Sequence, residues 1–138
     1  MAKTPVTLKV DGFEPREVAE VTYSFSQATD KEGQMSGIPR GGKINIKVKA
    51  LNSEKGQVQL LQWMLEKSMS KKGEIVFMKT TDGSDMKKIE FEDAYCIDFT
   101  EHWEDQVEGG TDLAHFEEIV LSCKKIKNGS AEYENAWA

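Results

Sequence analysis

Residues 88–103 read KIEFEDAYCIDFTEHW, and their alternation of apolar and polar side chains is the clearest indication of the fold class. One parity is polar and carries Glu90, Glu92, Asp98 and Thr100. The other parity is apolar and carries Ile89, Phe91, Tyr95, Ile97, Phe99 and Trp103. A period of two predicts a long β-strand with one buried face and one wet face. Asp93 falls on the apolar parity, and this interruption predicts a bulge or an end of pairing there.

Shorter runs with strand character lie on both sides of this stretch. Residues 73–79 are apolar on both parities, which predicts a strand that is covered on both faces. The other runs alternate and predict strands with one wet face, at residues 6–10, 21–25, 44–50 and 113–126.

One segment has helical rather than strand spacing. Val58, Leu61 and Leu65 recur at i, i+3 and i+7, which predicts an amphipathic helix at about residues 57–68. Together these elements predict a single, mainly β domain over residues 1–138. Strands of this length close into a barrel or a two-sheet sandwich, and the helix would cover an open side.

Length and composition exclude several classes of protein. The chain has 138 residues, 15.5 kDa, 30% charged residues and a net charge of −6. These values exclude a membrane protein, a collagen-like chain and a basic nucleic-acid binder. No apolar run approaches the ~20 residues that span a bilayer, and the N-terminus lacks the apolar core of a signal peptide. We therefore expect synthesis in the cytoplasm and no use of the general secretory route.

Few residues are of the types that carry chemistry. The histidines, His102 and His115, have no ligand-like spacing, so Glu101–Asp105 is expected to be a solvated strand end rather than a metal site. No phosphate loop, nucleophile elbow or dinucleotide motif is present. Cys96 and Cys123 lie in apolar runs and are expected to be free thiols. The residue types therefore single out no catalytic group, and we expect no metal and no cofactor.

Charge is distributed unevenly along the chain. Ile89 to Glu118 holds eleven acidic residues and no Lys or Arg, whereas Arg40 to Lys88 holds eleven basic residues and five acidic ones. A dipolar surface suits head-to-tail contacts, which close into rings or continue as filaments. The alternative is that the imbalance only reflects the charged wet faces of strands.

A long connection separates two of the predicted strands. It runs from Thr29 to Gly42 and is rich in turn-forming residues: Gly33, Gly37, Pro39, Gly41 and Gly42. Loops of this length without structure of their own are uncommon in small domains and are often functional.

The order and spacing of several segments match a known family. They are VTYSF at 21–25, GGKINI at 41–46, LLQWML at 60–65, GEIVF at 73–77, IEFEDAYC at 89–96 and KIKNGSAEYENAW at 125–137. On these segments, and over nearly its whole length, the chain resembles the tube protein of the bacterial type VI secretion system. The resemblance is to the Hcp (TssD) family in the form found in Bacteroidetes.

The resemblance implies a β-barrel formed by two sheets with one flanking helix, and a structural rather than enzymatic role. It implies hexameric rings with a wide pore that stack into a tube. Such a tube lies inside a contractile sheath, carries a VgrG spike and takes small effectors in its pore. It is assembled in the cytoplasm and injected without a signal peptide. No nucleic acid and no membrane insertion are implied.

The resemblance also suggests contact residues. The long connection matches the segment that helps rings stack, through Thr29, Asp30, Lys31, Glu32, Gln34, Met35, Ile38 and Arg40. For the seam between subunits we expect basic residues to face acidic ones, with the set Lys43, Lys47, Lys49, Trp63, Glu101, Glu104 and Asp105. Ion pairs at a rim contribute only about 0–1 kcal/mol each, so buried surface must hold a ring together.

Other functions compete with the tube subunit. A monomeric β-barrel that binds a small ligand would show a closed apolar cavity, whereas a ring would show an open, polar pore. An enzyme with scattered carboxylates has less support, because nothing singles out a catalytic pair. A tube paralogue dedicated to particular effectors has the same sequence pattern as the main subunit.

Overall fold

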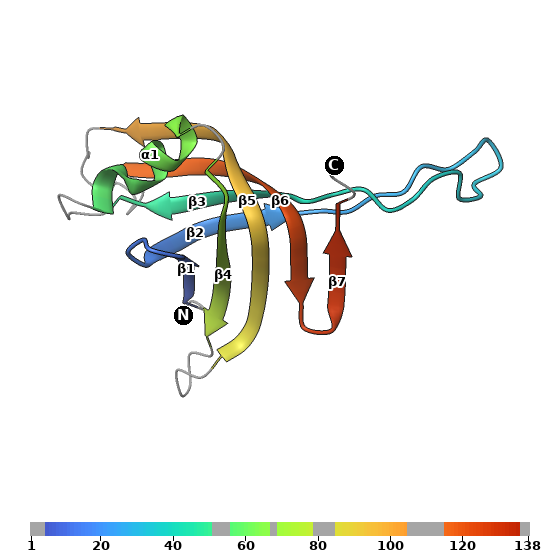
Figure 1. Cartoon of the computed structure of the whole chain (residues 1–138), viewed down its shortest axis with the longest axis horizontal. Helices are drawn as coiled ribbons and strands as arrows, with labels where there is room; N and C mark the ends of the chain where they lie inside the picture. Colours follow the sequence, from blue (N-terminus) through green and yellow to red (C-terminus); the bar gives the residue numbers. More distant parts are fainter. Residues whose placement is uncertain (1–4, 51–55, 67–68, 79–84, 105–114, 136–138) are drawn as a thin grey trace.

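The computed structural model describes residues 5–50, 56–66, 69–78, 85–104 and 115–135. Most of these residues form antiparallel strands (Figure 1), and a 3-10 turn, Gly56–Val58, leads into one α-helix, α1 (Gln59–Leu65). The strands are β1 (Val6–Val10), β2 (Arg16–Tyr23), β3 (Lys43–Lys49), β4 (Lys71–Met78), β5 (Asp85–Trp103), β6 (His115–Asn128) and β7 (Ala131–Glu134).

The strands close into a barrel. Their order is β3-β2-β1-β4-β5-β6, and β3 also pairs with β6, so the two ends of the sheet meet. β7 adds to β6 outside the closed ring of strands. The mainly β barrel with one short helix, which the sequence predicted, is confirmed. In the described part of the chain, no helix is long and apolar enough to cross a bilayer.

The barrel interior is filled by apolar side chains. The alternation predicted for β3 is confirmed, because Ile44, Ile46 and Val48 are buried while Lys43 and Asn45 are exposed. The core also contains Leu8, Val10, Leu60, Trp63, Ile75, Ile89, Phe91, Ala94, Cys96, Ile119, Leu121, Cys123 and Ile126. These side chains occupy the space that an interior ligand would need, so the structure does not favour the small-ligand barrel.

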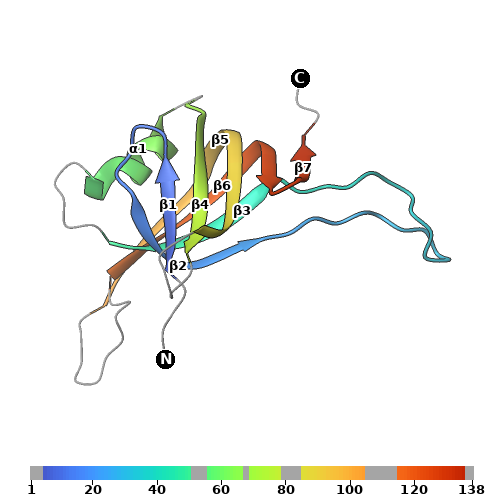
Figure 2. The same ribbon diagram turned by 90° about the horizontal axis from the view of Figure 1, so that it is seen from below.

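Helix α1 is shorter than the predicted segment at residues 57–68, of which residues 67–68 lie outside the described residues. Its Leu60 and Trp63 enter the core, and α1 packs against β5. Figures 1 and 2 place α1 on the side of the barrel away from the long connection between β2 and β3. Burial of one stripe on the barrel therefore stabilises a helix that is too short to be stable alone.

The pairing of the long strand β5 shifts register at three places, and only the shift at Asp93 was predicted; one of the others lies near its start, opposite Phe77 and Met78 of β4. Asp93 has a left-handed φ of 49°, and opposite it the register with β4 shifts between Lys71 and Gly73. This confirms the predicted interruption. The third shift, against β6, lies between Cys96 and Asp98. Each extra residue moves the following side chains to the other face.

The bulges explain where the sequence pattern of β5 was wrong. The predicted apolar parity placed Tyr95 and Ile97 with Phe91 on the buried face. In the structure Ala94 and Cys96 follow Phe91 into the core instead, and Ile97 is 43% exposed. The sequence could not show this switch of the buried face, because residues 94–97 are apolar at both odd and even positions.

Candidate assembly surfaces

The connection between β2 and β3 is a two-stranded arm that projects from the barrel (Figures 1 and 2). We define the arm as residues 24–42. Near its base, the backbone N–H groups of Ser26 and Arg40 each donate to the other residue's carbonyl, at 2.9 and 2.7 Å. Farther out, Thr29 bridges Met35, and the Ser36 N–H donates to Ala28 O. The predicted loop is thus a β-ribbon with its own hydrogen bonds.

A side-chain oxygen organises the tip of the arm. Oδ1 of Asp30 accepts hydrogen bonds from the backbone N–H groups of Glu32 (2.9 Å) and Gln34 (3.0 Å). Gly33 between them has a φ of 84°, which a residue without Cβ adopts readily. Asp and Gly therefore form the turn for the local reasons that make them common in turns.

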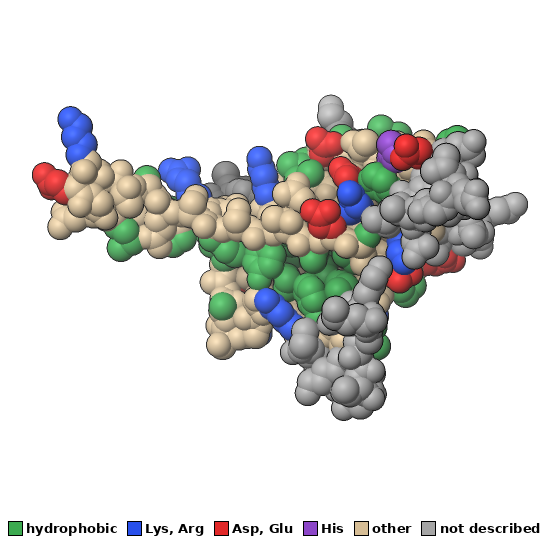
Figure 3. Space-filling model, turned by 180° about the vertical axis from the view of Figure 1, so that it is seen from behind, with side chains coloured by type: hydrophobic (Ala, Val, Ile, Leu, Met, Phe, Trp, Pro, Cys, Tyr) green, Lys and Arg blue, Asp and Glu red, His purple; other side chains and the backbone are tan. Residues whose placement is uncertain are grey.

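Apolar side chains on the arm are exposed to solvent. Met35 and Ile38 are 69% and 68% exposed, and Phe25 at the base is 41% exposed. Figure 3 shows apolar side chains along one edge of the arm and across the surface where it joins the barrel, while basic side chains project from the other edge. All eight residues predicted for stacking, from Thr29 to Arg40, lie on this exposed ribbon.

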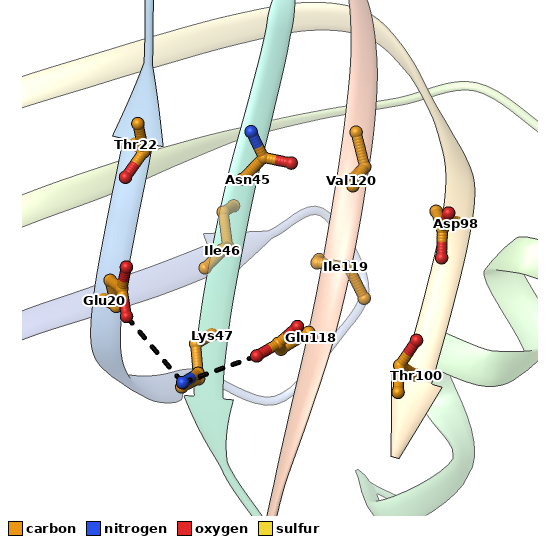
Figure 4. A pocket seen from close by; sticks show the side chains of 10 residues that line it. All are labelled: Glu20, Thr22, Asn45, Ile46, Lys47, Asp98, Thr100, Glu118, Ile119 and Val120. Atoms are coloured by element: carbon orange, nitrogen blue, oxygen red, sulfur yellow. Dashed lines mark ion pairs between the residues drawn. The ribbon is translucent and has the colours of Figure 1, made fainter. Parts of the chain in front are cut away.

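The basic residues predicted for the subunit seam lie on β3 or at its start, and two of them have partners in their own chain. Lys47 Nζ lies 3.7 Å from Glu20 Oε2 and 3.4 Å from Glu118 Oε1 (Figure 4). Lys49 Nζ lies 3.2 Å from Glu17 Oε1. Lys43 is exposed and makes no ion pair with another described residue.

The acidic residues predicted for the seam lie at the far end of β5. Glu101 Oε2 is 2.8 Å from His115 Nε2, and Glu104 Oε2 is 3.7 Å from His102 Nε2. Asp105 lies outside the described residues. Within one subunit the structure pairs neither Glu101 nor Glu104 with the lysines of β3.

Trp63 was predicted at the interface, and the structure places it in the core. Only 1% of the residue is exposed, and its ring packs edge-on against the Phe13 ring, with the two ring centroids 5.9 Å apart. The indole Nε1–H donates to Met69 O at 2.9 Å. Leu65 at the end of α1 and Trp103 at the end of β5 are instead exposed, at 72% and 66%, and Trp103 was not predicted as a contact residue. Their apolar character could not distinguish a buried from an exposed position.

A shallow polar depression lies on the outer face of the sheet around Lys47 (Figure 4). Thr22 of β2, Asn45 of β3, Glu118 of β6 and Asp98 of β5 line it. These side chains hydrogen-bond and carry charge, but no nucleophile with an adjacent base stands among them. The depression therefore presents a polar, solvated surface on the outside of the sheet.

The described residues offer little chemistry elsewhere. No three His, Cys, Asp or Glu side chains among them gather in a way that could hold a metal ion. Cys96 and Cys123 are free and buried, as predicted. Burial raises the pKa of the Cys96 thiol to about 11 and that of the Cys123 thiol to about 12. Both groups are therefore protonated at neutral pH and are poor nucleophiles.

Comparisons with known proteins agree with this geometry. The family model for hemolysin coregulated protein Hcp (TssD) matches residues 2–138. Hcp1 from Flavobacterium johnsoniae is 29% identical, with a TM-score of 0.82 over 95% of this chain and 99% of that chain. No curated protein sequence matches the chain.

More distant solved structures share the fold. Hcp1 from E. coli EAEC 042 is 15% identical, with a TM-score of 0.74 over 98% of this chain and 100% of that chain. Hcp1 from Salmonella typhimurium is 16% identical, with a TM-score of 0.73 over 96% and 95% of the two chains. The whole-length family match and the shared barrel establish that this chain belongs to the Hcp (TssD) family of type VI secretion tube proteins.

Proposed function

We propose that this chain forms hexameric rings, and that the arm of each subunit joins one ring to the next in a secretion tube. The observation that carries the proposal is the arm itself, a β-ribbon that extends from the barrel and exposes Met35 and Ile38 at 69% and 68%. Exposed apolar groups on a projecting element gain free energy when a second surface covers them, at roughly 25 cal/mol per Å².

The ring seam is the second part of the proposal. Lys47 and Lys49 already have carboxylate neighbours in their own chain, so they add little free charge to a seam. Lys43 on one side, and Glu101 and Glu104 on the other, stay exposed to a neighbouring subunit, although the two carboxylates also lie beside the imidazoles of His115 and His102. Exposed pairs contribute about 0–1 kcal/mol each, so they would set the orientation of the subunits while apolar burial holds them.

The tube would act with the other components that the family implies. We propose that it is assembled in the cytoplasm within a contractile sheath, carries a VgrG spike and is expelled with effectors in its pore. The polar depression around Lys47 supports a structural role, because it is a solvated sheet face without a catalytic constellation. A tube wall needs surfaces of this kind as well as apolar contacts.

The test separates stacking from ring formation. The double substitution Met35→Asp with Ile38→Asp should leave rings intact and abolish their stacking. Each subunit would then place two negative charges in the contact between rings. Met35→Leu with Ile38→Val is the matched control and keeps the apolar surface. Negative-stain images and light scattering measure both states. Equal stacking of the Asp variant and the wild type would disprove the role of the arm.

A further inference from the structure

The base of the arm is held by the C-terminal strand. The Gly41 N–H donates to the Tyr133 hydroxyl at 3.1 Å, and that hydroxyl donates to Asn135 Oδ1 at 2.6 Å. Asn135 Nδ2 in turn donates to Cys123 O at 2.9 Å and lies 3.4 Å from Gly41 O. The side chains of Tyr133 and Asn135 thus connect the backbone N–H and the carbonyl of Gly41 to the sheet.

Aromatic packing and close backbone approach complete this contact. The Tyr133 ring lies 4.9 Å from the Phe25 ring, centroid to centroid. A Cβ on Gly41 would come within 2.3 Å of the Phe25 ring. A Cβ on Gly42, whose φ is +98°, would meet the Asn135 amide at 2.3 Å. Both glycines are therefore required where the arm leaves the sheet. A side chain at position 41 would displace Phe25, and one at position 42 would displace Asn135.

The strand pairing explains why the arm turns away here. β3 pairs with residues 116–122 of β6, and β7 pairs with residues 125–128 along the same edge. The two strands meet end to end, where Cys123 N–H donates to Gly42 O and Asn135 N–H donates to Lys124 O. Because β7 occupies the edge that a longer β3 would use, the chain before Gly42 must leave the sheet.

We propose that Tyr133 and Asn135 are positioning residues that fix the base and direction of the arm, so that ring stacking depends on the C-terminal strand. The inference rests on the proposed role of the arm. Beyond this base, the described arm residues are exposed, so the contact with β7 carries the orientation of the ribbon.

The test compares three variants by hydrogen exchange and by stacking. Tyr133→Phe removes the hydroxyl that links Gly41 to Asn135, and Asn135→Ala removes the amide. Tyr23→Phe is the matched control, because the Tyr23 hydroxyl accepts from Asn128 Nδ2 at 2.7 Å and does not contact the arm backbone. All three proteins are used full-length, and their thermal unfolding is recorded to show that each folds.

The expected result is faster exchange of the Ser26 and Arg40 amides in the Tyr133 and Asn135 variants. The acceleration should be about tenfold, the factor that the loss of one or two hydrogen bonds gives in a local opening equilibrium. Stacking should fall in the same variants, while the control retains both properties. Unchanged exchange in both variants, or faster exchange with undiminished stacking, would overturn the inference.

Failure of the proposed function gives a different result. If the wild-type rings do not stack, or if the Met35 and Ile38 double Asp variant stacks normally, the role of the arm is wrong. The exchange rates of Ser26 and Arg40 still decide whether Tyr133 and Asn135 hold the arm in place.

Discussion

Arg16 and Glu117 are two charged side chains that the barrel buries, at 2% and 1% exposure. Arg16 Nη2 donates to Glu117 Oε2 and, at 2.8 Å, to Lys49 O. Nε and Nη1 of Arg16 and Oε1 of Glu117 have no hydrogen-bond partner in the described part of the chain. The pair therefore combines a strong mutual attraction with an incomplete set of hydrogen bonds, which makes it costly to break from one side.

Removing one partner should be far more harmful than removing both. Arg16→Met leaves a buried carboxylate without its cation and should lower the free energy of unfolding by about 3–5 kcal/mol. The double variant Arg16→Met with Glu117→Leu should lose much less, because no buried charge is left unpaired. Urea unfolding at one fixed protein concentration measures both values. A double variant as unstable as the single one would contradict this account.

No local pattern in the sequence indicates this buried pair. Glu117 is followed by Glu118, and Arg16 follows the turn after the first strand, so both looked like parts of wet faces. Arg16 lies at the start of β2 and Glu117 near the start of β6. The two residues are 101 positions apart in the sequence and meet only because β3 pairs with both strands. A contact of this range depends on closure of the barrel and not on any local pattern.

At the scale of elements, the bulges of β5 decide which of its faces is buried. Asp93 holds a left-handed φ of 49°, a conformation that Gly adopts freely, that Asn and Asp adopt at low cost, and that strains a β-branched residue. Asp93→Val should therefore lower the free energy of unfolding by about 1–2 kcal/mol, whereas Asp93→Gly should not lower it.

Glu92→Val is the control for this prediction, because Glu92 is exposed in the same strand and pairs in register with Lys125. Its effect should stay within about 0.5 kcal/mol. Thermal or urea unfolding of the three variants gives the comparison. If Asp93→Val were no more harmful than Glu92→Val, the backbone at Asp93 would not be strained as described.

Local patterns predicted which elements exist better than how they are arranged. The period of two in β3 and the double apolar run of β4 were predicted correctly, because Ile75 and Val76 are both buried. The bulge between Cys96 and Asp98 has no marker in the sequence, since Ile97 is apolar like its neighbours. Trp63 shows the same limit, because an apolar helix face predicts burial without saying against which partner.

The arm shows how far loop composition can be interpreted. Its glycines and its length predicted a functional connection between two strands. They did not predict the ribbon, because the two sides of the arm have no clear alternation. The direction of the ribbon depends on β7, whose Tyr133 lies 92 residues beyond Gly41, and which pairs with the same edge of β6 as β3.

At the scale of the whole molecule, the acidic end of β5 should contribute to association between subunits. Glu101→Lys with Glu104→Lys reverses two charges there and should weaken ring formation at low salt, with the difference shrinking as salt rises. Glu90→Lys with Glu92→Lys reverses the same number of charges elsewhere on β5 and should have a smaller effect. Sedimentation velocity at several salt concentrations measures the ring fraction. Rings that form equally well in the Glu101 and Glu104 variant at low salt would show that the pairing is wrong.

We have proposed that this barrel is the subunit of a ring. The most direct test of this proposal is the solution mass of the purified protein by light scattering on a sizing column, with negative-stain images of the main peak. We expect ring-shaped particles whose mass is that of six chains of 15.5 kDa, or of several such rings stacked, and the ring fraction should rise with protein concentration. A single species of 15.5 kDa at every concentration would contradict the proposal.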